Sequence, residues 1–313
     1  MADDTFEGDP HEARGLDREH PEQVSGVRLA GVLYEPGPRP STRRRRKRTP
    51  VTYLFRAIVL AYLFFLVAWP VFLVAKNTFA DGFSELGDLL SDPDSVEAIR
   101  LTIEVALIAV VINTVFGLGM AILLVRYDFP GKRLLSALID VPLSVSPIVV
   151  GLALVLVYGS RDGWLGSWLH DNGVDIIFHT PGIILATVFV ALPLVIREVV
   201  PVLEEIGVEQ EQAAKSLGAN AWQTFRRITL PSIKWAVVYG VVLSLARSLG
   251  EFGAVKVVSG NILGQTRTAT LMVEEKYLNF DKGGAYATAF LMVMVAVSAI
   301  VVVSLIRPKE TRK

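Results

Sequence analysis

The sequence predicts an all-α, polytopic membrane protein with about six transmembrane helices. Hydrophobic residues make up 52% of the 313 residues and charged residues only 20%, with a mean hydropathy of +0.46, which is too apolar for an ordinary soluble domain. Several apolar runs also reach the ~20 residues that a helix needs to cross the hydrocarbon core of a bilayer. The predicted spans are residues 54–75, 99–125, 134–158, 181–200, 235–258 and 285–306.

The segment before the first span differs in composition from the rest of the chain. It contains many acidic residues and prolines and few apolar ones, so we expect residues 1–50 to form a disordered cytoplasmic tail. Its basic run RRRRKR, residues 43–48, either binds anionic headgroups or, as we favour, anchors the next helix on the cytoplasmic side. Residues 51–98 are expected to contain the first transmembrane helix and an external segment.

Lysine and arginine residues are concentrated in alternate connecting segments. They lie in the tail, between the second and third spans, between the fourth and fifth spans, and at the end of the chain. Because positive residues next to membrane helices are retained in the cytoplasm, these segments share the cytoplasmic side. The sequence therefore predicts a multi-pass protein of the cytoplasmic membrane with both termini in the cytoplasm, including a short C-terminal tail of residues 308–313.

The third predicted span contains two prolines, Pro142 and Pro147. Each proline removes a helix hydrogen bond, so we expect a kink in this span. The freed backbone groups and the hydroxyls of Ser144 and Ser146 could hydrogen-bond a polar solute, although neighbouring helices could equally satisfy them. These two serines are therefore candidates for a polar path through the membrane.

The fifth predicted span contains two opposite charges, Arg247 and Glu251. Their spacing of four places both on one face of a continuous helix, and the cost of charge in hydrocarbon makes that face the interior of the bundle. One interpretation is a structural ion pair that locks helix packing. The other is a path in which Arg247 attracts anions and Glu251 holds or gates it, and the sequence leaves both open.

The polar stretch between the fourth and fifth spans, residues 201–233, contains the segment EQAAKSLGANAWQTFRRITLP, which runs from Glu211 to Pro231. It predicts a short helix, a turn at Gly218 and a second helix. A helix-turn-helix that reads DNA needs a basic face, whereas acidic and basic residues are equal in number between residues 201 and 234. We therefore exclude nucleic acid as a partner.

This stretch, here called the EAA-like loop, resembles the "EAA" loop of ABC importer permeases. That motif is a Glu-Ala-Ala-x-x-x-Gly run followed, after nine residues, by Ile-x-Leu-Pro. The matching positions are Gln212, Ala213, Ala214, Gly218, Ile228, Leu230 and Pro231, with only the leading glutamate replaced. The resemblance implies the type I ABC importer permease fold, with a core permease domain over residues 99–307 that contains the loop.

The resemblance extends beyond the loop, from about Asp92 to Ile306. This part of the chain is similar to sulfate importer permeases, and its segment LARSLGEFGAVKVVSG looks like the W-type member of the sulfate and thiosulfate permease pair. The likeness implies a pore-forming permease subunit of an ATP-driven importer, which moves the oxyanion by alternating access. A molybdate or tungstate permease is the nearest alternative, and an ATP-independent secondary anion transporter is a more distant one.

The same resemblance implies partners and the residues that meet them. The partners are a second, T-type permease subunit, two copies of an ATP-binding subunit, an external sulfate-binding protein and the lipid bilayer. The residues expected to dock on the ATP-binding subunit are Glu211, Gln212, Ala213, Ala214, Gly218, Trp222, Ile228, Leu230 and Pro231. Glu211 would partly replace the charge lost at Gln212. The candidate translocation path comprises Ser144, Ser146, Arg247 and Glu251.

No catalytic residue, metal site or bound cofactor is expected in this chain. It has no cysteine, and its four histidines are scattered without the spacing of metal ligands. It lacks the Gly-x-x-x-x-Gly-Lys-Ser/Thr sequence that holds ATP phosphates, so ATP, magnesium and the ATPase activity are expected on the partner subunits. A membrane-anchored enzyme or scaffold is disfavoured, because no grouping of nucleophile, base and orienting residue is evident.

Overall fold

The structure is a computed structural model that describes residues 28–29, 32–33, 50–80 and 82–306. The chain forms two units, residues 1–58 and 59–313. In the first unit, two-residue strands β1 (Arg28–Leu29) and β2 (Val32–Leu33) pair antiparallel, and helix α1 (Pro50–Leu63) begins. Most of the predicted N-terminal tail, including the run RRRRKR, and the predicted C-terminal tail lie outside the described residues.

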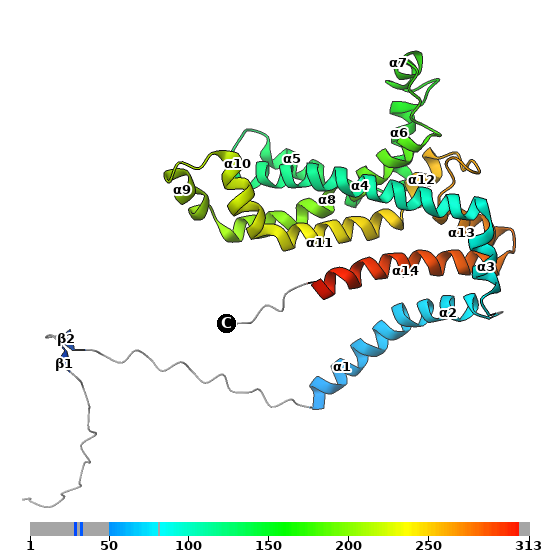
Figure 1. Ribbon diagram of the computed structural model, residues 1–313, viewed down its shortest axis with the longest axis horizontal. Coiled ribbons are helices and arrows are strands. Elements are labelled where there is room, and N and C mark those ends of the chain that lie inside the picture. Colours follow the sequence, from blue (N-terminus) through cyan, green and yellow to red (C-terminus); the bar gives the residue numbers. More distant parts are fainter. Residues whose placement is uncertain (1–27, 30–31, 34–49, 81, 307–313) are drawn as a thin grey trace, which may run out of the picture. The chain divides into compact units, whose positions relative to one another are not determined.

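In the second unit all described elements are helices, as predicted. Helix α1 continues through the π-helix η1 (Phe64–Ala68) into α2 (Trp69–Thr78), and the short α3 (Ser84–Ser91) precedes the long α4 (Pro93–Arg126). The others, labelled where there is room in Figure 1, are α5 (Lys132–Ser144), α6 (Pro147–Tyr158), α7 (Gly166–Asp171), α8 (Thr180–Ile206), α9 (Glu209–Ser216), α10 (Ala221–Thr224), the π-helix η2 (Phe225–Thr229), α11 (Leu230–Leu249), α12 (Gly253–Val258), α13 (Ala269–Leu278) and α14 (Lys282–Ile306).

The expected number of membrane spans is confirmed. Among the described residues, five helical stretches are long and apolar enough to cross a membrane, and the bent pair α5 and α6 would make a sixth. Several helices extend beyond the predicted spans, and the extension of α8 affects the EAA-like loop. The fourth span was expected to end at residue 200, but α8 continues through Pro201 to Ile206, where Gly207 with a φ of +72° ends it. The first residues of the EAA-like loop are therefore part of a long helix.

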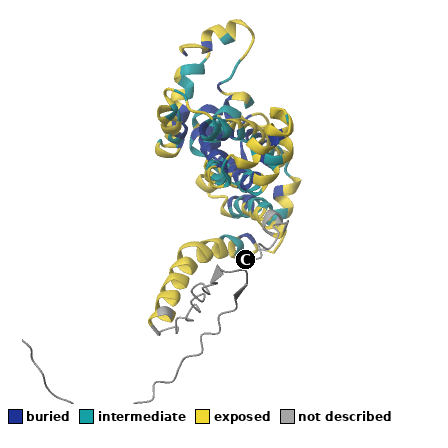
Figure 2. Ribbon diagram, turned by 90° about the vertical axis from the view of Figure 1, so that its left-hand side faces the viewer, coloured by how far each residue is buried: buried dark blue, intermediate teal, exposed yellow. Residues whose placement is uncertain are grey.

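Helices α4, α8 and α11 pack side by side and form the centre of the second unit (Figure 1). Both α4 and α11 approach α8 closely at Val195. A Cβ atom placed on Gly117 of α4 would lie 3.0 Å from the Val195 Cβ, and one placed on Gly240 of α11 would lie 2.9 Å from the Val195 Cα. Glycine therefore allows both neighbours to approach the same point of α8, as small residues do in membrane bundles. Figure 2 shows the buried residues gathered in the interior of the helical part, and those of one cluster come from α4, α8 and α11.

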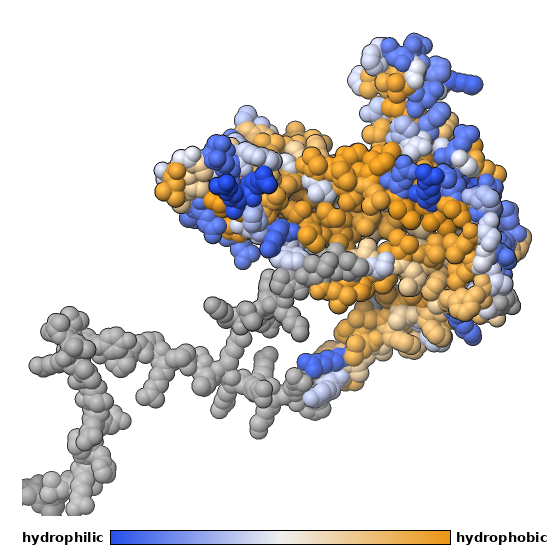
Figure 3. Space-filling view, viewed as in Figure 1, coloured by the Kyte–Doolittle hydropathy of each residue, from blue (hydrophilic) through white to orange (hydrophobic). Residues whose placement is uncertain are grey.

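The outer surface of these helices is apolar between two polar ends. Figure 3 shows hydrophobic surface over α4, α11 and α14, and hydrophilic surface at the end formed by α9 and α10. Exposed apolar side chains of α4 include Leu107, Val111 and Val115. An apolar face of this kind is what a helix presents to lipid or to another membrane helix.

Candidate functional site

The EAA-like loop folds as two short helices joined at Gly218, as predicted. Helix α9 ends where the Ala219 N–H donates to the Ala214 carbonyl at 3.0 Å and Gly218 adopts a φ of +86°. Side-chain-bearing residues avoid this left-handed conformation, so glycine permits the turn. Helix α10 then begins with a capping box, in which the side chains of Asn220 and Gln223 each accept a hydrogen bond from the other's backbone N–H.

One arginine holds the EAA-like loop against α4. Arg126, the last residue of α4, donates from Nε and Nη2 to the two carboxylate oxygens of Glu211 at 3.1 and 3.2 Å. It also donates to the carbonyl oxygens of Leu203 at 3.1 Å and Gly207 at 2.7 Å, where α8 ends and its last carbonyls lack intrahelical partners. The Thr229 hydroxyl donates to Glu211 as well. A single guanidinium group thus joins α4, α8 and α9.

The structure gives Glu211 contacts within the chain that the sequence did not predict. Its side chain is only 15% exposed, and both carboxylate oxygens are bound by Arg126. Gln212, the neighbouring residue, is exposed and offers an uncharged amide. The other predicted docking residues divide by exposure, with Ala213, Gly218, Trp222 and Pro231 exposed, Ile228 and Leu230 half-buried, and Ala214 buried.

Two large apolar side chains stand out on this otherwise polar loop. Leu217 is 89% exposed, and Trp222 is 65% exposed with its ring 5.6 Å from that of Phe225. The same loop also lines a hollow of about 320 Å³ between the end of α4, α9 and η2, together with Arg126. Exposed aromatic and aliphatic side chains on a polar loop are typical of a surface that contacts another protein.

The third predicted span is broken rather than kinked. Helices α5 and α6 diverge by 113°. Pro142 lies inside α5, which continues past it to Ser144, and Pro147 begins α6, where its missing N–H costs no hydrogen bond. Ser144 and Ser146 flank the break, and both are exposed.

The fifth predicted span is broken as well. Helix α11 ends at Leu249, and α12 begins at Gly253. The two breaks meet, because a Cβ atom placed on Gly253 would lie 3.0 Å from the Pro147 Cβ. Beyond them α6 and α12 stay in contact, since a Cβ atom placed on Gly151 would lie 2.9 Å from the Ala254 carbonyl oxygen. Two interrupted helices that meet inside a membrane protein are a recurrent setting for solute sites in transporters.

Arg247 and Glu251 form the expected ion pair at this second break, although not on one helix as predicted. Arg247 belongs to the last turn of α11, whereas Glu251 lies beyond its end, and the Arg247 Nη1 is 2.7 Å from the Glu251 Oε2. The other carboxylate oxygen accepts a hydrogen bond from the Ala254 N–H at 2.9 Å. The glutamate side chain is 2% exposed and the arginine 36%. The carboxylate is therefore fixed inside the protein while the guanidinium reaches the surface.

The sequence reasoning missed a second intramembrane ion pair. Asp140 of α5 and Arg197 of α8 lie inside the third and fourth predicted spans, and the Arg197 Nε and Nη2 atoms are each 3.0 Å from the Asp140 Oδ1. Both side chains are about half exposed, at 55% for the arginine and 44% for the aspartate. A charge at the centre of a membrane helix costs about 2.5–3.5 kcal/mol on insertion scales. The signal that identified Arg247, a charge within an apolar span, could have found this pair too.

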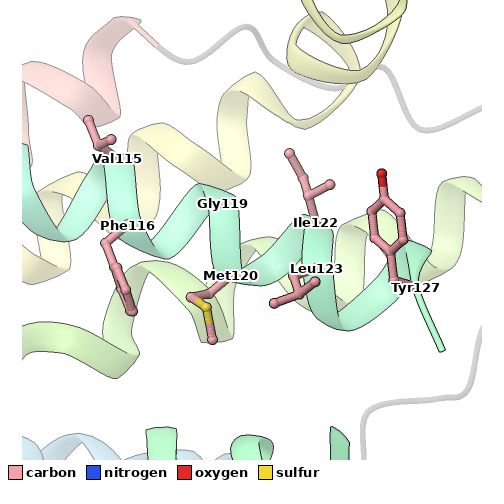
Figure 4. A pocket seen from close by; sticks show the side chains of 7 residues that line it. All are labelled: Val115, Phe116, Gly119, Met120, Ile122, Leu123 and Tyr127. Atoms are coloured by element: carbon pink, nitrogen blue, oxygen red, sulfur yellow. The ribbon is translucent and has the colours of Figure 1, made fainter. Parts of the chain in front are cut away.

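A further hollow on the chain has a different character. A groove of about 410 Å³ is lined only by residues of α4 and the residue that follows it. Figure 4 shows these residues, namely Val115, Phe116, Gly119, Met120, Ile122, Leu123 and Tyr127. No charged group lines the groove. Because an anion needs hydrogen-bond donors or positive charge when it leaves water, this groove does not suit one.

Comparison with known proteins identifies the family. The family described as "Binding-protein-dependent transport system inner membrane component" matches residues 113–312. The chain is 49% identical to the "Sulfate transport system permease protein CysW" of Synechococcus elongatus, covering 82% of this chain and 89% of the relative. It is 44% identical to the protein of the same name from Escherichia coli strain K12, covering 78% and 83%.

A solved structure supports the same fold. The bacterial ABC transporter involved in the import of the acidic polysaccharide alginate matches with a TM-score of 0.67 at 17% identity, covering 82% of this chain and 93% of that one. Helical architecture, the EAA-like loop and these likenesses agree, and the chain belongs to the family of inner membrane components of binding-protein-dependent transport systems.

Proposed function

We propose that this chain is the W-type, pore-forming permease subunit of an ATP-driven importer of sulfate and thiosulfate. The observation that carries the proposal is the likeness to two sulfate permeases named CysW, which extends over most of the chain. The complete assembly would add a T-type permease subunit, two ATP-binding subunits and an external sulfate-binding protein. ATP and magnesium would bind to the ATP-binding subunits, and this chain would carry out no hydrolysis.

The EAA-like loop would be the part of this chain that moves when the ATP-binding subunits bind ATP. Leu217, Trp222 and Gln212 present their side chains outward, and the small residues Ala213 and Gly218 would let the partner approach closely. Glu211 acts differently in this proposal, as the residue through which Arg126 positions α9. Movement of α9 would then pass directly to the ends of α4 and α8.

The anion path would pass the meeting point of the two helix breaks. Ser144 and Ser146 supply hydroxyl donors there, and Arg247 supplies a positive charge that Glu251 orients. A doubly charged oxyanion loses much hydration energy on entering the protein, and hydrogen-bond donors that replace water offset that loss. The ion pair thus serves both interpretations, because its buried carboxylate fixes packing while its half-exposed guanidinium faces the path.

Labelled sulfate uptake tests the proposal. Cells that lack their own sulfate importers would express this chain with its partner subunits, with unlabelled thiosulfate or molybdate as competitor. We expect uptake that thiosulfate in excess blocks and equimolar molybdate scarcely changes, because both permease relatives carry sulfate names. Competition dominated by molybdate would assign the chain to the molybdate and tungstate group.

The matched control replaces the ATP-binding subunit with a variant that binds but does not hydrolyse ATP. Uptake should then fall to background. Undiminished uptake with that variant, or uptake by this chain alone, would show that a secondary anion transporter is the correct description.

A further inference from the structure

Helix α5 carries a polar stripe along its length. Ser136, Asp140 and Ser144 are spaced by four residues and so lie on one helix face. The two serines are exposed and the aspartate is half-buried, while Ile139 and Pro142 are buried on the packed side of the helix. The stripe covers about 12 Å at the rise of an α-helix. It runs from the break at Ser144 toward Lys132, where the helix begins.

Arg197 is the cation beside this stripe. It emerges from a stretch of α8 in which Val195, Ile196 and Val199 are all buried, and it reaches Asp140 across the contact between α8 and α5. Two residues from both Val195 and Val199, the Arg197 side chain points to the other side of α8, where it is 55% exposed, with Glu198 as its charged neighbour in the chain.

The two intramembrane arginines lie at different depths. Val195 and Gly240 mark one level, because α8 and α11 touch there. Arg197 follows Val195 by two residues, or about 3 Å toward the EAA-like loop, and Arg247 follows Gly240 by seven residues, or about 10 Å in the opposite direction. The guanidinium groups therefore originate about 13 Å apart in depth, with the helix breaks on the side of Arg247.

We propose that the stripe on α5 and Arg197 form the section of the anion path between the helix breaks and the EAA-like loop. The proposal rests on the proposed function, since it assigns the residues that the same anion meets next. A stripe that is polar and exposed on a membrane helix faces water or protein rather than lipid. Its continuity with Ser144, at the break, favours the water-filled path.

Because of Asp140, an anion could bind in this section of the path and leave it again quickly. When no anion is bound, the Asp140 carboxylate pairs with the guanidinium group of Arg197. An arriving oxyanion also offers negatively charged acceptor oxygens for charge-assisted hydrogen bonds and takes the place of Asp140. The displaced carboxylate then remains close to a like charge, which shortens the stay of the anion. Conduction requires a site of this kind, attractive enough to enter and weak enough to leave.

Water access to Arg197 is the first test. The chain has no native cysteine, so an Arg197→Cys variant in the assembled importer carries a single reactive thiol in this subunit. We expect it to react with a membrane-impermeant, cationic methanethiosulfonate, and we expect sulfate supplied with the binding protein and ATP to slow that reaction at least 3-fold. Absence of reaction would place the residue in lipid or in a closed subunit interface and overturn the proposal.

Exchanging the charges of Asp140 and Arg197 tests whether Arg197 belongs to the anion path or only holds α5 against α8. Arg197→Gln should reduce sulfate uptake at least 10-fold, and Asp140→Asn should reduce it less. The double variant Asp140→Arg with Arg197→Asp restores an ion pair of the same residues, yet we expect its uptake to stay near that of Arg197→Gln. Recovery to wild-type uptake in the exchanged pair would show that the pair only holds α5 to α8.

A control pair at the start of the same helix calibrates these effects. Asp128 and Lys132 form an exposed ion pair 2.9 Å long, and the double variant Asp128→Asn with Lys132→Gln should transport as the wild type does. Failure of the wild-type importer to move sulfate would refute the proposed function itself. Normal wild-type uptake with an unaffected Arg197→Gln variant would refute only the assignment of Arg197.

Discussion

Arg126 makes more structural contacts than its position at the end of α4 suggests. A positive residue at the end of a membrane helix ordinarily serves orientation. Here its side chain is 10% exposed and binds two carbonyl groups at the end of α8 and a carboxylate of α9. Hydrogen bonds with a charged donor contribute about 1.5–3 kcal/mol each, so the loss of this residue should loosen the EAA-like loop first.

Replacement of Arg126 by alanine should therefore make α9 open more easily. We expect the opening free energy to fall by about 2 kcal/mol, which corresponds to about 30-fold faster amide hydrogen exchange in residues 209–216. The matched control is Arg100→Ala, because the Arg100–Glu97 pair is exposed and 3.7 Å long. Equal protection of the α9 amides from hydrogen exchange in the Arg126→Ala and Arg100→Ala variants would mean that apolar contacts hold the loop instead.

The residues of the site could be predicted from the sequence to different extents. Gly218 and the Arg247–Glu251 pair were identified, because both depend on residues close together in the chain. The contacts of Arg126 join positions 77 to 85 residues apart, and nothing in a single sequence marks such partners. The inward orientation of Glu211 was not predicted for the same reason, since it depends on that distant arginine.

At the scale of elements, the sequence predicted where helices cross the membrane but not where they break. Apolar length determines the span, and both broken spans have enough of it. The prolines near Ser144 predicted a bend without its size. The end of α11 has no proline, and its break is associated with the close approach of Gly253 to Pro147 on another span. Tertiary packing of this kind is not visible in local patterns.

The helix-turn-helix of the EAA-like loop offers an element-scale test. Gly218→Val forces a branched side chain into a φ of +86°, although no atom crowds the position, so the strain is confined to the backbone of the turn. We expect at least 10-fold less ATP-binding subunit to co-purify, with normal membrane insertion. Gly173→Val is the matched control, because its φ is +79° with equal space but it lies in another loop. Equal loss of the partner in both variants would argue against docking through this turn.

The whole molecule has surface that only an assembly or lipid can cover. The span Tyr53–Thr78 is apolar on all sides, and none of its most apolar window is buried. In a soluble protein such a helix would be an aggregation hazard, whereas in a membrane it is stable against lipid or a neighbouring subunit. The exposed apolar helix therefore suits a membrane protein, as an inner membrane component of a transport system is.

Orientation in the membrane is the corresponding whole-molecule prediction. Ser216 of α9 and Ser167 of α7 are both exposed, and the chain has no native cysteine. In intact cells we expect a membrane-impermeant maleimide to label Ser167→Cys but to label Ser216→Cys only after the membrane is permeabilised, since positive residues keep the EAA-like loop inside. The reverse pattern would invert the proposed topology and place both termini outside.

Under the proposed function, the contacts of Arg126 also have a consequence for the order in which the importer would assemble. Because α9 is held by bonds within its own chain, its surface exists before any ATP-binding subunit arrives. Docking is then an encounter of two formed surfaces, for which association rates of about 10⁵–10⁷ M⁻¹ s⁻¹ are typical, rather than a folding event that must follow contact. Permease subunits without a partner would therefore already present a folded docking surface in the membrane. The supply of ATP-binding subunits would then set the rate at which complete importers form.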